Sequence, residues 1–180
     1  MKATGIVRRI DDLGRVVIPK EIRRSMRIRE GDPLEIYTDS DGEVIFKKYS
    51  PIGELSEFAA QYADVLVKST DIPVLICDRD HCIAAAGLSR KEVLERRVTA
   101  DLEDITESRK TYFVTAGDTR RISPLEGVDY TAAVASPIIA AGDVCGAVIF
   151  LMTERGALPT EHDVRLAQIA ANFLGKQMEE

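Results

Sequence analysis

Short apolar runs at the start of the chain alternate with residues that favour turns. Residues 4–10 (TGIVRRI) and 15–19 (RVVIP) have the composition of strands, and between them Gly14 supplies a residue that tolerates a positive φ. Proline is well suited to the first turn of a helix, so residues 20–27 (KEIRRSMR) should form a short helix after Pro19. The pattern predicts a hairpin followed by a helix.

A second hairpin is predicted directly afterwards. Gly31 is placed to end the helix, and residues 33–40 and 43–49 flank the pair Asp41-Gly42, which is typical of a tight hairpin turn. About fifty residues in thin hairpins bury too little apolar surface to be stable alone without a disulfide, a metal or a partner. This segment contains no cysteine. We therefore expect an obligate homodimer in which two chains complete each other's core.

The pattern changes at Ser50-Pro51, because a residue that precedes proline disfavours helix and a long helical period follows. We expect one domain over residues 1–50 and a second over 51–180. Apolar residues at spacings of three and four predict a helix that ends near Ser69 and packs on another helix: Ile52, Leu55, Ala59, Tyr62 and Leu66.

A second amphipathic helix is predicted at the other end of the domain. Thr160 and Asp163 have the spacing of a capping box. The apolar stripe that follows contains Leu166, Ile169, Ala170, Phe173 and Leu174. We expect these two helices to join dimers into a homotetramer.

The region between the two helices is predicted to be mostly strand. Residues 74–80, 81–87 and 128–152 are rich in Val, Ile and Ala, and Gly142-Asp143 divides the last run in two. Residues 88–130 are ambiguous, with a helical pattern around 91–105 and weaker strand signals after it. The second domain is thus predicted to be an α+β unit, an antiparallel sheet with helices against one face and a pocket edge near residues 88–130.

Charge is distributed unevenly along the 180 residues. The net charge is −6, but residues 1–29 contain nine Lys and Arg against three acidic residues, a local net charge of +6. The other 151 residues contain 15 basic and 27 acidic side chains, a net charge of −12. This split indicates local contact with a polyanion, while the acidic remainder limits non-specific binding.

The basic residues share surfaces of the predicted elements. A helical period places four of them on one helix face: Lys20, Arg23, Arg24 and Arg27. Arg8, Arg9 and Arg15 lie on the first predicted hairpin. Crowded cations repel each other, and the planar guanidinium group matches phosphate oxygens and the guanine edge, which favours an external nucleic-acid ligand. The alternative is a solvated face with local salt bridges to Asp11, Asp12 and Glu21.

Residues 1–49 resemble the swapped-hairpin DNA-binding domain of the AbrB transition-state regulator family. The resemblance implies an interleaved dimer that presents arginines to double-stranded DNA, and the family's contact positions correspond to Arg8, Arg9, Arg15, Arg23 and Arg24. Lys20 and Arg27 are secondary candidates that rest on helix geometry alone. Antitoxins of toxin and antitoxin pairs use the same N-terminal fold, and they remain the alternative function.

The continuation of the chain is similar to family members in which such a domain precedes a GAF domain. That similarity implies a regulator of sporulation genes, as activator or repressor. GAF domains are small-molecule sensors or dimerisation modules, and the residues do not choose between these roles or identify a ligand. We expect no cofactor.

The segment CDRDHC contains the densest group of reactive side chains, Cys77, His81 and Cys82. Four zinc ligands at recognisable spacing are not present, because the other histidine and cysteine are isolated. A hairpin turn around Asp78 to Asp80 is the favoured interpretation. We therefore predict neither a metal site nor an enzyme. The N-terminus has no apolar signal core and the three cysteines suggest no disulfide framework, so we expect a cytoplasmic, nucleoid-associated protein.

Overall fold

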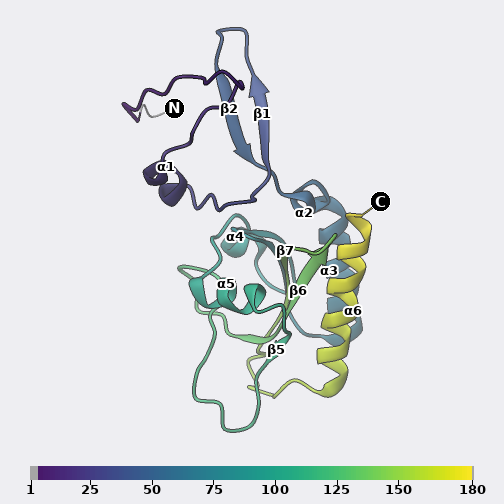
Figure 1. Ribbon diagram of the computed structural model, residues 1–180. Coiled ribbons are helices and arrows are strands. Elements are labelled where there is room, and N and C mark those ends of the chain that lie inside the picture. The colour runs from purple at the N-terminus through teal and green to yellow at the C-terminus, as the bar shows by residue number, and fades with distance from the viewer. Residues whose placement is uncertain (1–3, 180) are drawn as a thin grey trace. The chain divides into compact units, whose positions relative to one another are not determined.

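The computed structural model describes residues 4–179, and the chain divides into two compact units, Met1–Tyr49 and Ser50–Glu180. The first unit contains helix α1 (Lys20–Ser25) and the strands β1 (Leu34–Thr38) and β2 (Val44–Lys48) (Figure 1). The two strands form the predicted antiparallel hairpin, with Leu34 opposite Lys48. Asp39 Oδ1 accepts hydrogen bonds from the amides of Asp41 and Glu43, each at 3.0 Å, which fixes the turn between the strands.

The first predicted hairpin is only partly formed. A turn is present, in which the Asp11 amide donates to the Arg15 carbonyl and the Gly14 amide to the Asp11 carbonyl, each at 3.0 Å. Residues 4–10 and 15–18 are extended but are not paired strands in the single chain. Their apolar side chains are exposed, Val7 to 85% and Val17 to 70%, so beyond the turn itself these side chains do not pack the two segments together within the described residues.

Helix α1 is shorter than the sequence predicts. It ends at Ser25, and the Ile28 amide donates to the Arg23 carbonyl at 2.8 Å while Arg27 adopts a φ of 51°. A left-handed residue with such a bond terminates a helix, so the end lies before Gly31. Arg27 therefore lies beyond α1, and the prediction that it shares the helix face is wrong.

The second unit is built on a five-stranded antiparallel sheet with the order β4-β3-β7-β6-β5. Its strands are β3 (Val74–Asp78), β4 (Cys82–Ala86), β5 (Tyr112–Phe113), β6 (Ala132–Ala140) and β7 (Asp143–Leu151). Helices α2 (Pro51–Glu54), α3 (Ser56–Thr70) and α6 (Glu161–Gln177) bracket the strands in sequence, as predicted. Helices α4 (Arg90–Val93) and α5 (Ala100–Glu107) come from the ambiguous segment.

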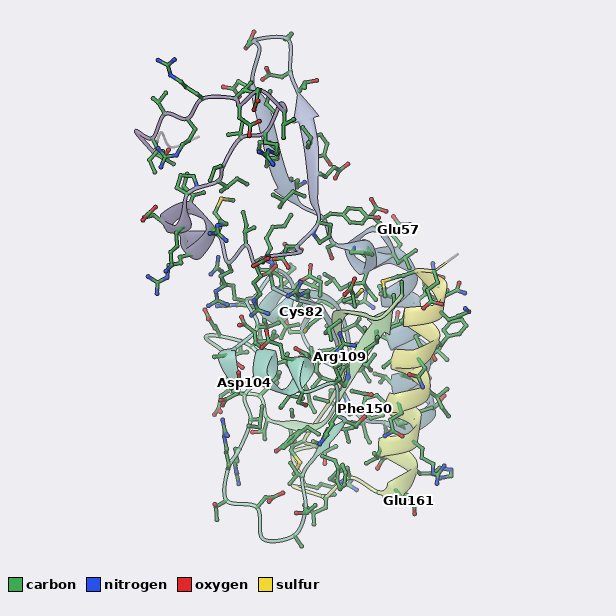
Figure 2. All side chains as sticks on the ribbon, in the orientation of Figure 1. Glu57, Cys82, Asp104, Arg109, Phe150 and Glu161 are labelled. Atoms are coloured by element: carbon green, nitrogen blue, oxygen red, sulfur yellow. The ribbon has the colours of Figure 1, made fainter. Side chains whose placement is uncertain are left out.

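Both faces of the sheet are covered, which corrects the prediction that helices pack on one face. Helices α3 and α6 lie side by side on one face, while α5 lies on the other (Figure 1). Phe150 is fully buried in the first of the two apolar layers, and Cys82 is fully buried in the second (Figure 2). The central strands therefore have almost no exposed side chains, because both of their faces are in contact with other elements.

Two predicted helices are each interrupted. The first is divided into α2 and α3 at Leu55, and Ser50 caps α2 through a hydrogen bond from the Gly53 amide to its Oγ at 3.1 Å. The helix predicted over 91–105 is divided because residues 95–98 run along the sheet edge. There the Glu95 amide donates to the Cys82 carbonyl at 2.9 Å, and Glu95 has a φ of 61°.

Helix α6 approaches the sheet closely at one glycine. A Cβ built on Gly175 would overlap the carbonyl oxygen of Ile139 in β6, and only a residue without a side chain fits there. At its other end, α6 begins with the predicted capping box, in which Thr160 and Asp163 bond each other's backbone amides. Helix α6 is therefore fixed at its first turn by a local cap and near its last turn by close contact with β6.

Candidate functional site

Helix α1 presents a basic surface. Lys20, Arg23 and Arg24 are all exposed, and they occupy positions i, i+3 and i+4 of the helix, while Ile22 on the other side is half-buried. Within the part of the chain that the structure describes, these three cations form no ion pair with an acidic side chain. Their charge is therefore available to an external anion.

Helix α1 is connected to the hairpin β1-β2 by the segment that follows it. Lys48 at the end of β2 donates from Nζ to the carbonyl oxygen of Arg27 at 3.0 Å. The Arg29 amide donates to Asp32 Oδ2 at 2.8 Å within the same connection. Arg27 is half-buried, so of the two secondary candidates only Lys20 is fully on the exposed helix surface.

The remaining predicted contacts lie on either side of the first turn. Arg8 and Arg9 are exposed in the extended segment before it, and Arg15 follows it directly. Asp11 holds Arg15 in place: its Oδ1 accepts from the Arg15 amide at 2.8 Å and its Oδ2 accepts from Arg15 Nε at 2.8 Å. These bonds, the backbone one first, hold the pKa of the Asp11 carboxyl below its usual value.

The alternative interpretation of the basic residues, a solvated face with local salt bridges, required ion pairs with nearby acidic residues. One such pair, Arg15 with Asp11, is present. The Arg15 side chain is still 69% exposed, and an ion pair at such a surface contributes little stability. Sequence reasoning treated Asp11 only as a possible counter-ion and missed its role as the turn residue. The signal that could have shown this role is an aspartate at the first position of a turn, where its side chain can accept hydrogen bonds from the backbone amides that follow.

The described part of the N-terminal unit, residues 4–49, has no apolar core of its own. Among the described residues, every buried apolar side chain larger than proline lies in the second unit, from Ile52 onward. Thirteen large apolar side chains in the described part of the first unit are exposed instead, from Ile45 at 36% to Val7 at 85%. A segment with this surface is incomplete as a single chain.

The paired helices of the second unit also expose an apolar face. Phe58 and Tyr62 on α3 stack with their ring centroids 6.2 Å apart, and Phe173 on α6 lies 5.3 Å from the Tyr62 ring. Phe173 is 42% exposed, and Ile169 one turn earlier is 60% exposed. The predicted stripe on α6 is therefore divided, since Ala170 and Leu174 face the sheet while Ile169 and Phe173 face outward.

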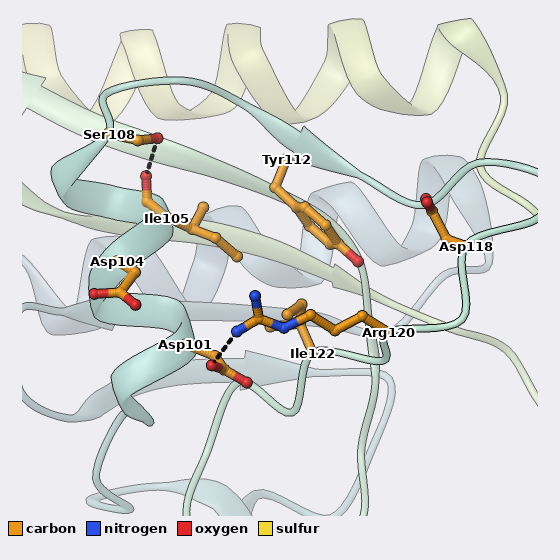
Figure 3. A pocket seen from close by; sticks show the side chains of 8 residues that line it. All are labelled: Asp101, Asp104, Ile105, Ser108, Tyr112, Asp118, Arg120 and Ile122. Carbon is orange, nitrogen blue, oxygen red and sulfur yellow. Dashed lines mark hydrogen bonds and ion pairs between the residues drawn. The ribbon is translucent and has the colours of Figure 1, made fainter.

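A cavity of about 370 Å³ lies on the other face of the sheet, within the region where sequence reasoning placed a pocket edge. Its walls come from α5, from β5 and from the loop that leads into β6 (Figure 3). The lining residues are Asp101, Asp104, Ile105, Ser108, Tyr112, Asp118, Arg120 and Ile122. Arg120 bonds Asp101 across the cavity, from Nη2 to Oδ1. The individual lining residues were not predicted from the sequence.

The segment from Cys77 to Cys82 forms a β-hairpin, as predicted. Asp78 Oδ1 accepts from the amides of Asp80 and His81 at 2.7 and 2.6 Å, and Cys77 and Cys82 are cross-strand partners. Both thiols are fully buried, and the neighbouring Cys82 together with burial raises the pKa of Cys77 well above its usual value. Residues 4–179 include no group of three or more His, Cys, Asp or Glu side chains placed to hold a metal ion.

The chain thus consists of a basic N-terminal unit and a separate sheet flanked by helices. Comparison with known proteins identifies its class, a two-domain transcription regulator with an AbrB-type N-terminal domain and a GAF-like C-terminal domain. The chain belongs to the stage V sporulation protein T family. Residues 54–179 match the family model described as "Stage V sporulation protein T C-terminal, transcription factor", and residues 7–53 match "Antidote-toxin recognition MazE, bacterial antitoxin". Homologues in this family are transcription factors.

The sequence is similar to curated proteins from Bacillus subtilis strain 168. It is 50% identical to stage V sporulation protein T over 182 aligned residues, which cover 100% of both chains. It is 63% identical to the transition state regulatory protein AbrB over 51 residues, which cover 28% of this chain and 52% of AbrB. Both resemblances drawn from the sequence are confirmed.

The fold of the second unit is that of a GAF domain. The GAF domain of a phosphoenolpyruvate-protein phosphotransferase from Coxiella burnetii aligns with a TM-score of 0.53 and 18% identity, over 68% of this chain and 82% of that one. The predicted α+β fold with an antiparallel sheet is thereby confirmed. No helix in the described residues combines the length and apolarity needed to cross a membrane.

Proposed function

We propose that this transcription regulator binds double-stranded DNA as a homodimer through residues 1–50. The contact set is Arg8, Arg9, Arg15, Arg23 and Arg24, with Lys20 in a secondary role; Arg27 is left out because it lies beyond the helix whose geometry made it a candidate. The 63% identity to AbrB over 51 residues supports this proposal, as does the net charge of +6 over residues 1–29. Arginine forks neutralise phosphates and reach base edges in the major groove, and DNA shape contributes to the choice of site.

The observation that carries the dimer is the bare apolar surface of residues 4–49. A chain with no buried apolar cluster there gains little from folding alone, whereas two chains can cover each other's exposed Val7, Val17 and Ile36. The extended segments 4–10 and 15–18 are available to pair with a second copy. Dimerisation would also bring two sets of arginines onto one surface.

The outward apolar face of α3 and α6 supports assembly of dimers into a homotetramer. Aromatic side chains are enriched in the centres of protein interfaces, and Phe173 forms such a cluster with Phe58 and Tyr62. The relationship to stage V sporulation protein T supports control of sporulation genes. The cavity beside α5 is the site at which a small molecule would act on the assembly.

The antitoxin function has less support. The antitoxin family model covers residues 7–53 only, whereas residues 54–179 match a transcription-factor domain and the full-length relative is a sporulation protein. Antitoxins share the N-terminal fold with regulators, so the fold alone does not distinguish them. Recovery of a stoichiometric small basic toxin with the purified protein would reverse this ranking.

Salt dependence tests the DNA contact. With about eight phosphate contacts per dimer, the logarithm of affinity should fall with the logarithm of salt concentration at a slope of roughly −7. Arg23→Ala removes one contact from each chain, so the slope should become about 2 units less steep. Arg121→Ala, a matched exposed arginine in the second unit, should leave the slope unchanged. Fluorescence anisotropy with a labelled duplex measures the slope, and a flat salt response contradicts the proposal.

Sedimentation of the full chain tests the assembly. Phe173→Ser should convert tetramers into dimers, because it removes the central ring of the outward face. Leu158→Ser is the control, since Leu158 is comparably exposed at 46% but lies outside α3 and α6. A full-length monomer, or a tetramer unaffected by Phe173→Ser, would refute the proposed interface.

A further inference from the structure

The cavity beside α5 has the size and walls of a site for an organic molecule. Its volume of about 370 Å³ lies within the range of roughly 300–1,000 Å³ that small-molecule sites occupy. Ile105 and Ile122 supply aliphatic walls, and the ring of Tyr112 supplies an aromatic one (Figure 3). These walls would stabilise a carbon skeleton, which a bare ion does not have.

The charged groups of the cavity do not balance. Three carboxylates line it, against the single guanidinium of Arg120. Arg120 is already paired with Asp101, so its charge is compensated within the protein. Asp104 and Asp118 have no basic partner among the described residues. The lining therefore carries two negative charges in excess.

Asp118 is held in its anionic form by the loop that carries it. Its Oδ2 accepts hydrogen bonds from the Thr115 amide at 2.8 Å and from the Thr115 hydroxyl at 2.9 Å, and these bonds lower the pKa of the carboxyl. Both bonds use the same oxygen, which leaves Oδ1 for another donor. The adjacent Tyr112 has a raised pKa, through burial and then through Asp118, so its ring stays neutral and can face a cation.

We propose that this cavity takes a small organic cation, an amine or a diamine whose carbon chain rests on Ile105, Ile122 and Tyr112 while its ammonium groups meet Asp104 and Asp118. The inference rests on the sensing role given to the cavity above and adds the class of ligand. An anionic ligand is disfavoured, because it would have to displace Asp101 from Arg120 and would meet two uncompensated carboxylates. A metal ion is disfavoured because the lining carboxylates do not form a ligand cluster of three within residues 4–179.

Three probes of equal length isolate the effect of charge. They are 1,4-diaminobutane, 1,4-butanediol and succinate, titrated at constant ionic strength into the full-length protein with 13C-labelled isoleucine δ1 methyl groups. Ile105 and Ile122 report on the cavity, and Ile169 on the outward face of α6 is the internal control. Diaminobutane should shift the two cavity signals saturably and leave Ile169 unchanged, and its binding should weaken as salt is raised.

Variants then test the carboxylate contact. Asp104→Asn should weaken diaminobutane binding about two- to fivefold, the range for one exposed ion pair. Asp143→Asn removes the same charge at the β6–β7 turn, outside the cavity, and should leave binding unchanged. Equal weakening by both variants would mean that only net charge matters, and it would overturn the assignment to this cavity.

The relative affinities of the three probes decide the class of ligand. Binding of butanediol as tight as that of diaminobutane, or binding of succinate instead, would leave a ligand site but overturn its cationic class. Failure of all three probes would overturn the class and the sensing role of the cavity together. DNA affinity measured on the same sample reports separately on the proposed regulator function, because the cavity residues lie outside the arginine contact set.

Discussion

Gly175→Ala sets two opposite effects against each other. In an exposed helix the change would stabilise by about 1 kcal/mol, because glycine loses more backbone entropy than alanine on folding. In α6 the new Cβ would overlap the Ile139 carbonyl oxygen and lie 3.1 Å from the Ile139 carbonyl carbon. Both are backbone atoms, so no flexible side chain can move away, and α6 or β6 must shift.

Overpacking of this kind costs about 1–3 kcal/mol, and an overlap with backbone belongs at the upper end of that range. After the gain in helix propensity is subtracted, Gly175→Ala should lower the free energy of unfolding by about 1–2 kcal/mol. Urea denaturation followed by circular dichroism measures this change.

Asn172→Ala is the matched control, because Asn172 is exposed on the same helix and has only the propensity effect. It should stabilise the protein by about 0.5 kcal/mol. If Gly175→Ala were neutral or stabilising as well, α6 could not approach β6 as closely as described.

Three further predictions concern other local contacts. Thr160→Ala should cost about 1 kcal/mol in urea denaturation because it removes the capping-box bond from the Asp163 amide, whereas Thr160→Ser should retain most of it. The pKa of Asp11 is lowered in the folded chain, so its contribution is present above its unfolded pKa and is lost as the pH falls through the folded one. The protection factor of the Arg15 amide, which is the exchange rate corrected for its intrinsic pH dependence, should therefore fall only in strongly acidic solution, and a fall near neutral pH would contradict this. Cys77 should resist a thiol reagent at pH 8 until the protein unfolds, because its thiol is buried and its pKa is raised; rapid labelling of the native protein at this position would disprove the buried arrangement.

Local sequence signals predicted the elements whose contacts are local. The Thr160 capping box, the Asp41-Gly42 turn and the hairpin around Asp78 all depend on residues within a few positions of one another, and the structure confirms each. The β6–β7 hairpin was also predicted, although its turn residues are Ala141 and Gly142, both at positive φ.

Elements that depend on distant partners could not be predicted in the same way. Residues 95–98 leave the helical pattern because they bond to β4, which the local period does not reveal. Asp101 and Arg120 meet across the cavity from positions 19 residues apart, and no spacing rule connects them. Residues 4–10 have strand composition, yet a single chain offers them no strand to pair with. The arginine contacts remain predictions, since their partner is a molecule outside the chain.

The uncovered apolar surface of residues 4–49 has a consequence for how the regulator responds to its own abundance. In the proposed dimer, folding of the DNA-binding unit is a second-order process, so the fraction of competent protein rises with subunit concentration. Newly made chains at low abundance would have a folded second unit and an inactive first one. Gene control would then begin at a threshold of expression, and dilution of the protein during growth would switch it off without any ligand.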